Sequence, residues 1–301
     1  DCPAGHTCDG TTATKCAAGK YVDANACLAC PAGLACDGTN AFYIVADKIE
    51  LLTMLAAWKE NATSAKAQYG RLPAWDTSKV TDMSVLFCRV IVDVESDCVL
   101  EVADTFNENI GGWDVSRVTT LYNTFYGLTA FNAPIGGWDV SSVTDMDYAF
   151  YGAAAFDASI GAWDTSKLTT MYGTFERAST FNAPIGGWDV SSVTDMDYAF
   201  YGAAAFDASI GAWDTSKLTR MAGMFADTPF NQDIGAWDTS QVTTMYGAFQ
   251  GATAFNRDIG AWDVASVTHM QDMFEGAISF DQDLSGWDRS SCITGWPPGC
   301  P

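Results

Sequence analysis

One 25-residue unit recurs along most of this chain, and it limits the possible folds more than any other feature. In residues 131–156 the unit reads FNAPIGGWDVSSVTDMDYAFYGAAAF. After its first Phe, the unit places Ile at four residues, Trp-Asp at seven and eight, Val at twelve, Met at fifteen and Phe at nineteen. Between Trp75 and Trp287 the unit occurs nine times. Internal repeats of about 20 to 50 residues are typical of arrays in which each unit contacts only its neighbours.

The tryptophan spacing shows where the array is regular. Most neighbouring tryptophans are 25 residues apart, but 38 residues separate Trp75 from Trp113, because residues 88–98 form an insertion with a cysteine at each end. Residues 131–169 are identical to residues 181–219. A block duplication of this kind is typical of structural scaffolds and unusual for enzymes.

Each repeat has two halves with different patterns. Residues 143–153 place apolar side chains at spacings of three, four and three, which predicts a helix of about ten residues. Ser142 would cap this helix, and Gly152 would end it. Residues 131–139 predict a short extended segment and a tight bend. Stacked repeats would then align their aromatic side chains in ladders. The predicted repeat-core tryptophans are Trp113, Trp138, Trp163, Trp188, Trp213, Trp237, Trp262 and Trp287.

The composition divides the chain into four parts. We expect a disulfide-rich module at 1–40, a capping helix and linker at 41–70, the repeat array at 71–290 and a C-terminal disulfide cap at 291–301. An even number of clustered cysteines predicts disulfides and an oxidising compartment, but six cysteines in the first module leave the pairing open. A zinc site at Cys27 and Cys30, completed by Cys2, Cys8 or His6, is the alternative. The predicted disulfide cysteines are Cys2, Cys8, Cys16, Cys27, Cys30, Cys36, Cys88, Cys98, Cys292 and Cys300.

Residues 42–60 have the pattern of an amphipathic helix. Asp47 is its expected N-cap, and the expected buried face comprises Ile49, Leu52, Leu55 and Ala56. Such a helix could bind a membrane, but its place directly before the first repeat favours a cap over the array. We expect a linker at 61–70 and glycosylation at Asn61, the first residue of an Asn-Ala-Thr sequon.

The charge excludes one class of partner. The chain has 15 Lys and Arg against 37 Asp and Glu, a net charge of −22 and an isoelectric point near 4.1. Such a surface repels phosphate backbones, so we expect no nucleic-acid partner. No apolar run reaches about 20 residues, so we expect no membrane span. No signal-peptide pattern follows residue 1, and we expect any signal peptide to have been removed.

Aspartate, threonine and tyrosine also recur at fixed places in the repeat. The aspartate after each tryptophan could form a Ca²⁺ column, with Asp139, Asp164, Asp189 and Asp214 as candidates, or accept backbone N–H groups in Asx turns. We favour turns, because calcium-binding coils carry several carboxylates per turn. The threonines of the column that starts at Thr81 are expected to cap helices, with ice binding as a remote alternative. The tyrosines expected to form an exposed aromatic row are Tyr126, Tyr151, Tyr172, Tyr201 and Tyr246.

The repeat resembles the 25-residue repeat of bacterial surface proteins and mycoplasma lipoproteins, grouped with the BspA-like leucine-rich repeats. Residues 230–284 carry the best match. The resemblance implies an α/β repeat fold: a leucine-rich-repeat-like right-handed solenoid of about nine 25-residue coils, exposed at a cell surface and associated with adhesion. It implies no catalytic residue. Residues 1–40 are similar to the cysteine-rich modules of tumour-necrosis-factor receptors and ephrin receptors.

These observations together predict a secreted, non-enzymatic structural protein. We expect a self-assembling subunit of an extracellular fibre, coat or flagellar appendage, whose partners are copies of itself or other structural proteins. The alternative is a monomeric surface adhesin or receptor ectodomain that binds a glycan or a protein. We expect no enzyme and no cofactor, because the two histidines, His6 and His269, lie in no recognisable nucleophile pattern.

Overall fold

The computed structural model describes residues 41–87 and 105–291, together with five short strands before them. Six strands pair as three antiparallel ribbons, β1 with β2, β3 with β4 and β5 with β6. Their bounds are His6–Cys8, Ala13–Lys15, Lys20–Asp23, Ala26–Ala29, Ala35–Cys36 and Ala41–Phe42, in order from β1 to β6.

Cys27 is disulfide-bonded, which removes its thiolate from the zinc alternative. The side chains of the other nine predicted disulfide cysteines lie outside what the structure describes, as do most of the insertion and the C-terminal cap, residues 292–301. The pairing of the cysteines therefore stays a prediction.

The capping helix is present, but of the face expected to be buried only Leu55 is fully buried. Helix α1 spans Lys48–Glu60, and the side chain of Asp47 accepts the N–H of Glu50 at 2.9 Å, as an N-cap should. The buried residues are Leu51, Met54 and Leu55, whereas Ile49 is 75% exposed. Two apolar stripes overlap in this helix. The one that is buried continues to Trp58, whose ring packs edge-on against Trp75 of the first coil at 6.1 Å.

The linker expected at 61–70 is instead mostly helical. Helix α2 spans Ala62–Tyr69, and the side chain of Asn61 caps it by accepting the N–H of Ser64 at 3.0 Å. A single 3-10 turn, η1 (Leu72–Ala74), leads into the first repeat. In the described part of the chain, neither α1 nor α2 is long and apolar enough to cross a bilayer.

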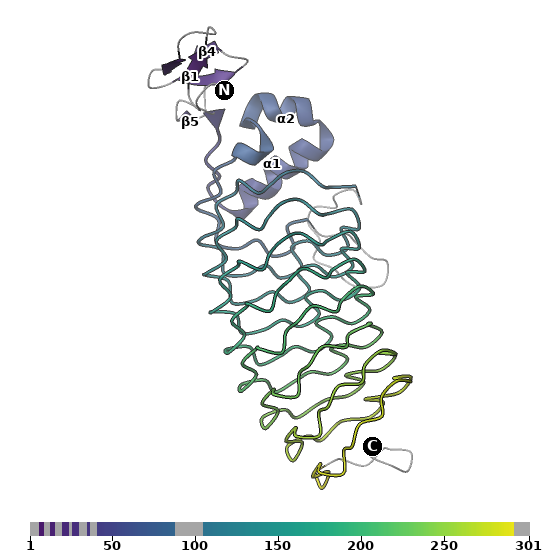
Figure 1. Ribbon diagram of the computed structural model, residues 1–301. Helices are drawn as coiled ribbons and strands as arrows, with labels where there is room; N and C mark the ends of the chain where they lie inside the picture. The colour runs from purple at the N-terminus through teal and green to yellow at the C-terminus, as the bar shows by residue number, and fades with distance from the viewer. Residues whose placement is uncertain are drawn as a thin grey trace.

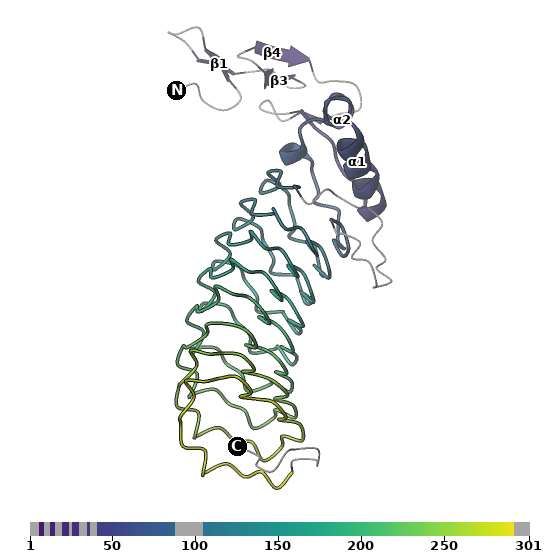
Figure 2. The same cartoon turned by 90° about the vertical axis from the view of Figure 1, so that its right-hand side faces the viewer.

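The repeats lie one above the other as coils of a column, with α1 and α2 over one end (Figure 1). The same column seen from the side shows each coil beside the next (Figure 2). Parallel bridges join residues of adjacent coils, such as Asp145 with Thr170 and Thr170 with Asp195. Residues that are neighbours along the column are therefore about one repeat apart in the sequence.

The helix predicted for each repeat is wrong. Within residues 143–153, residues 147–152 form turns, and no α-helix occurs within residues 75–87 or 105–291. Alternate N–H groups donate to the next coil: Tyr148 donates to the carbonyl of Tyr172 at 2.8 Å, and Phe150 to that of Thr174 at 2.9 Å. In a helix, these groups would bond to the carbonyl four residues earlier. Both arrangements bury the same positions, so the apolar spacing could not distinguish them.

The predicted aromatic ladders are present in the core. Phe150 stacks on Phe175 with ring centroids 5.5 Å apart, and Trp163 stacks on Trp188 at 6.1 Å. All eight predicted repeat-core tryptophans are buried. Each of their indole N–H groups donates to a carbonyl of the coil before, as Trp163 does to Ile135 at 3.2 Å. Burying one large apolar side chain contributes about 1.5 to 3 kcal/mol, so each coil is held mainly by its ladders.

Candidate functional site

The aspartate after each repeat tryptophan stabilises a turn. In all nine, the carboxylate accepts the N–H two residues later at 3.0 to 3.1 Å, which is the geometry of an Asx turn. The hydrogen bond from the Ser141 hydroxyl lowers the pKa of Asp139, and Ser166 does the same for the pKa of Asp164. Among the described residues, no three potential metal ligands form a cluster.

The threonine column does not cap helices, because the coils contain turns at this place. Instead, each threonine donates to the threonine of the coil before it. The N–H and the hydroxyl of Thr169 both donate to the carbonyl of Thr144, at 2.9 and 2.8 Å. The column therefore joins adjacent coils along an exposed edge. Ice binding by these threonines stays an untested alternative.

Tyrosine side chains form a continuous surface on the column, which we call the tyrosine face. Its members come from five of six successive coils, since the coil of Trp213 has none, and they lie partly exposed. They are Tyr122, Tyr126, Tyr148, Tyr151, Tyr172, Tyr198, Tyr201 and Tyr246. Tyr126 stacks on Tyr151 at 4.4 Å, and Tyr148 contacts the rings of Tyr151 and Tyr172 edge-on at 5.9 and 5.0 Å. Tyr172 and Tyr198 continue the series at 5.8 Å.

Two of these tyrosines occupy strained backbone positions. Tyr148 and Tyr198 have φ angles of 55° and 58°, in the left-handed region that bulky residues rarely adopt. The same place in the neighbouring coils holds Gly173 and Gly223, and each glycine lies under a tyrosine ring. A Cβ atom at Gly173 would come within 2.6 Å of the Tyr148 ring, and one at Gly223 within 2.6 Å of the Tyr198 ring. The repeat sets a positive φ at this place in every described coil, and in two of them a tyrosine occupies it despite the cost to a bulky residue.

Glu176 takes the place of a tyrosine in the outer column, between Tyr151 and Tyr201, and Arg177 follows it. The guanidinium of Arg177 lies 5.8 Å from the Tyr151 ring centroid and 5.9 Å from that of Tyr201, within cation–π range of both. It also donates to the Tyr151 hydroxyl at 3.0 Å. Beside it, burial raises the pKa of Glu176 to about 7. Arg177 therefore bridges two rings that are two coils apart.

A pocket of about 370 Å³ opens in the tyrosine face. Its polar centre is Asp197, whose side chain is 1% exposed. One oxygen of Asp197 accepts the N–H of Ala222 at 2.6 Å, and the other pairs with the Arg220 guanidinium. Arg220 also contacts Asp195 at 3.2 Å. Burial raises the pKa of Asp197 despite the nearby Arg220. The pocket is lined by Tyr172, Asp197, Tyr198, Arg220, Ala222, Thr244, Tyr246 and His269.

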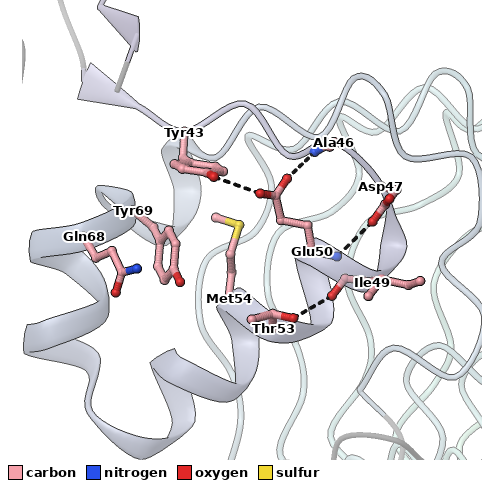
Figure 3. Close-up of a pocket in the computed structure, with 9 residues that line it drawn as sticks. All are labelled: Tyr43, Ala46, Asp47, Ile49, Glu50, Thr53, Met54, Gln68 and Tyr69. Carbon is pink, nitrogen blue, oxygen red and sulfur yellow. Dashed lines mark hydrogen bonds between the residues drawn. The ribbon is translucent and has the colours of Figure 1, made fainter. Parts of the chain in front are cut away.

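A second pocket of about 640 Å³ lies beside α1 and α2 (Figure 3). Glu50 stands at its edge, and both carboxylate oxygens are occupied: Tyr43 donates its hydroxyl at 2.8 Å and Ala46 its N–H at 2.6 Å. Tyr69 of α2 faces Met54 across the pocket. Because its one carboxylate is already bonded within the protein, Glu50 holds the chain where it enters α1.

The structure regroups the predicted tyrosine row. Tyr172 and Tyr246 lie in one column and Tyr126, Tyr151 and Tyr201 in another, so the expected single row is wrong. Sequence reasoning missed Tyr148 and Tyr198. The signal was their place in the repeat, where the other described coils have glycine, asparagine, aspartate or, in the first coil, Val85.

Sequence reasoning also missed the Asp197, Arg220 and His269 grouping. Arg220 and His269 occupy the same place in their repeats, two coils apart, but nothing in the local sequence marks either one. Only the stacking brings them to one pocket.

Comparison with known proteins gives one match. A family model matches residues 53–92, 94–213 and 196–294, which include the whole array of repeats. No curated protein and no solved structure matches the chain. Since the match covers more than half of the chain, the protein belongs to the family described as Mycoplasma protein of unknown function, DUF285.

Proposed function

We propose that this protein binds an extended glycan along its tyrosine face, as a surface adhesin or receptor ectodomain would. The observation that carries the proposal is the series of tyrosine rings in contact over four coils, from Tyr126 to Tyr201, two of them at positive φ angles. A tyrosine ring offers a rigid apolar face for a sugar ring and a hydroxyl for its polar edge.

The polar groups between the rings suit the same ligand. Asp145, Thr170 and Asp195 alternate along the column beside the tyrosines, so hydrogen-bond donors and acceptors recur once per coil. The net charge of −22 disfavours acidic polymers. The proposed ligand is therefore a neutral glycan.

We place this function in a wider proposal for the molecule. The column of coils is proposed to be a leucine-rich-repeat-like right-handed solenoid related to the BspA-like repeats, and residues 1–40 a cysteine-rich, receptor-like module. A secreted or cell-surface location, glycosylation at Asn61, and the absence of catalysis and cofactors belong to the same proposal. The array thus presents one long face, and the module stands at its N-terminal end.

The test is a glycan array probed with the whole chain and with two variants. Tyr126→Ala with Tyr151→Ala removes one stacked pair from the face and should reduce binding to the neutral glycans at least tenfold. Asp164→Asn is the control, because it lies in the turn column and its amide can still accept the Ser166 N–H. Equal binding by the double variant and the parent chain would contradict the proposal.

Self-assembly is a second candidate with its own observation. Residues 131–169 recur unchanged as residues 181–219, and a block duplication of this kind is typical of structural scaffolds. Light scattering and negative-stain microscopy, with and without Ca²⁺ and reductant, test this candidate. Regular filaments would support it, and a 32 kDa particle under every condition would contradict it.

A further inference from the structure

The pocket in the tyrosine face exists because of one small residue. In the column that holds Tyr172 and Tyr246, the two coils between them have Asp197 and Ala222, and Ala222 is 5% exposed. Tyrosine and aspartate alternate in this column from Tyr122 to Asp197, so Ala222 stands where the next tyrosine ring would otherwise lie. Tyr198, held flat over Gly223, forms another wall. The hollow thus has aromatic sides, with the buried Asp197 and the small Ala222 between them.

The hollow also has fixed hydrogen-bond donors. Arg220 contacts Asp195 and Asp197 through two of its nitrogens. A guanidinium has five N–H donors, so several remain for a ligand. Thr244 and His269 line the opposite side, and the Nδ1 atom of His269 lies 2.9 Å from the Thr268 hydroxyl. Among the described residues, the Nε2 atom of His269 has no hydrogen-bond partner, so it is available to a ligand.

We propose that this hollow, the Ala222 pocket, binds one uncharged pyranose ring, with a tyrosine ring against one of its faces and Arg220 donating to its oxygens. This inference rests on the proposed function and names the subsite that selects the sugar. An uncharged sugar fits because the two carboxylates outnumber the one guanidinium, which disfavours an acidic sugar. An amino sugar is disfavoured because Asp195 and Asp197 are already paired with Arg220.

The duplicated block supplies a variant that should fold. In the first copy, the equivalent of Arg220-Met221-Ala222 is Thr170-Met171-Tyr172, preceded by the same 39 residues. Arg220→Thr combined with Ala222→Tyr therefore installs a combination that the chain already contains 50 residues earlier. The matched control is Lys217→Gln, because Lys217 is exposed and outside the pocket, and the next coil has Gln241 at that place.

The probes are the methyl glycosides of glucose, galactose, mannose and N-acetylglucosamine, with glucuronate and glucosamine as charged comparisons. Saturation-transfer NMR on the whole chain measures their binding at millimolar concentrations. We expect at least one neutral pyranoside to bind, the double variant to bind it at least tenfold more weakly, and Lys217→Gln to bind it unchanged. Three results would overturn the proposal: equal binding by the double variant and the parent chain, tighter binding of a charged sugar, or no binding of any neutral pyranoside.

The two proposals fail in different ways. If array glycans bind, and Arg220→Thr combined with Ala222→Tyr leaves pyranoside binding unchanged, the proposal for the Ala222 pocket is wrong and that for the tyrosine face stands. If pyranoside binding depends on Arg220 and Ala222 while Tyr126→Ala with Tyr151→Ala has no effect on the array, the pocket stands and the extended face is wrong.

Discussion

The two copies of the duplicated block have the same 39 residues and different surroundings. In the first copy, Asp147 accepts the hydroxyl of Thr170 at 2.5 Å and the N–H of Tyr172 at 2.9 Å. In the second copy, the equivalent Asp197 pairs with Arg220 and accepts the N–H of Ala222. Burial raises the pKa of Asp147 to about 6, and it also raises the pKa of Asp197.

The difference arises from the following coil alone. The block ends at residues 169 and 219, and the residues that contact Asp147 and Asp197 come directly after it. In a column of coils, a side chain meets residues that are about 25 positions away in the sequence. One copy therefore presents a closed tyrosine surface and the other a pocket. Duplicated repeats can acquire different roles through substitutions in a neighbouring coil.

The largest expected difference between the copies follows from removing the partner of each aspartate. Arg220→Ala leaves Asp197 buried without its cation and should lower the free energy of unfolding by about 3 kcal/mol. Thr170→Ala removes one hydroxyl from Asp147 and should lower it by about 1 kcal/mol. Urea denaturation at pH 7 measures both. Equal losses would show that the ion pair does not distinguish the copies.

Glycine substitutions under the rings should have the next largest effect. Gly173→Ala and Gly223→Ala each bring a Cβ atom to within 2.6 Å of a tyrosine ring at a positive φ angle. We expect each substitution to lower the free energy of unfolding by about 2 kcal/mol, from the backbone and the displaced ring together.

Gly247→Ala is the matched control. Gly247 has a φ of 58°, but the nearest atom to its Cβ would be 3.5 Å away on Gln250. Gly247→Ala should lower the free energy of unfolding by about 1 kcal/mol, from the backbone alone. Thermal unfolding and the near-ultraviolet tyrosine signal measure the three variants. The ring contact has no role if all three behave alike.

A smaller effect is expected in the pH dependence of the first copy. Because the folded protein raises the pKa of Asp147 to about 6 from 3.8, the folded state holds the proton more tightly than the unfolded state. This contribution is complete below about pH 4 and is lost as the pH rises through 6. The free energy of unfolding should therefore decrease between pH 4 and 7.5, and Asp147→Asn should make this decrease smaller by about 1 kcal/mol, after allowance for the partial exposure of the carboxyl. Urea midpoints between pH 4 and 7.5 test it, and parallel curves for the two proteins would refute the shift.

The smallest effect should be the same in both copies. Asp139→Ala and Asp189→Ala each remove one Asx-turn hydrogen bond, at 3.1 and 3.0 Å, from a turn with the same sequence. We expect equal and slight decreases in melting temperature. A clear difference between these two variants would mean that the following coil influences the turn column as well as the tyrosine face.

Much of the core could be predicted from the repeat. The period identified Trp163 and Trp188 as stacked neighbours, and the Asp47 N-cap followed from its place before an apolar stripe. The helix prediction for residues 143–153 failed because hydrogen bonds between coils, which leave no local pattern, replaced those within a helix. The buried face of α1 was misassigned because two stripes overlap and Trp75 selects between them.

The sequence by itself determined the period, the aromatic ladders and the net charge, since these depend only on which residues recur and how often. The tertiary structure decided which side chains meet on the tyrosine face and around Asp197. The physical reason is that stacking brings together residues from adjacent coils. Arg220 reaches Asp197 across 23 positions of the chain, and no pattern within one repeat records that contact.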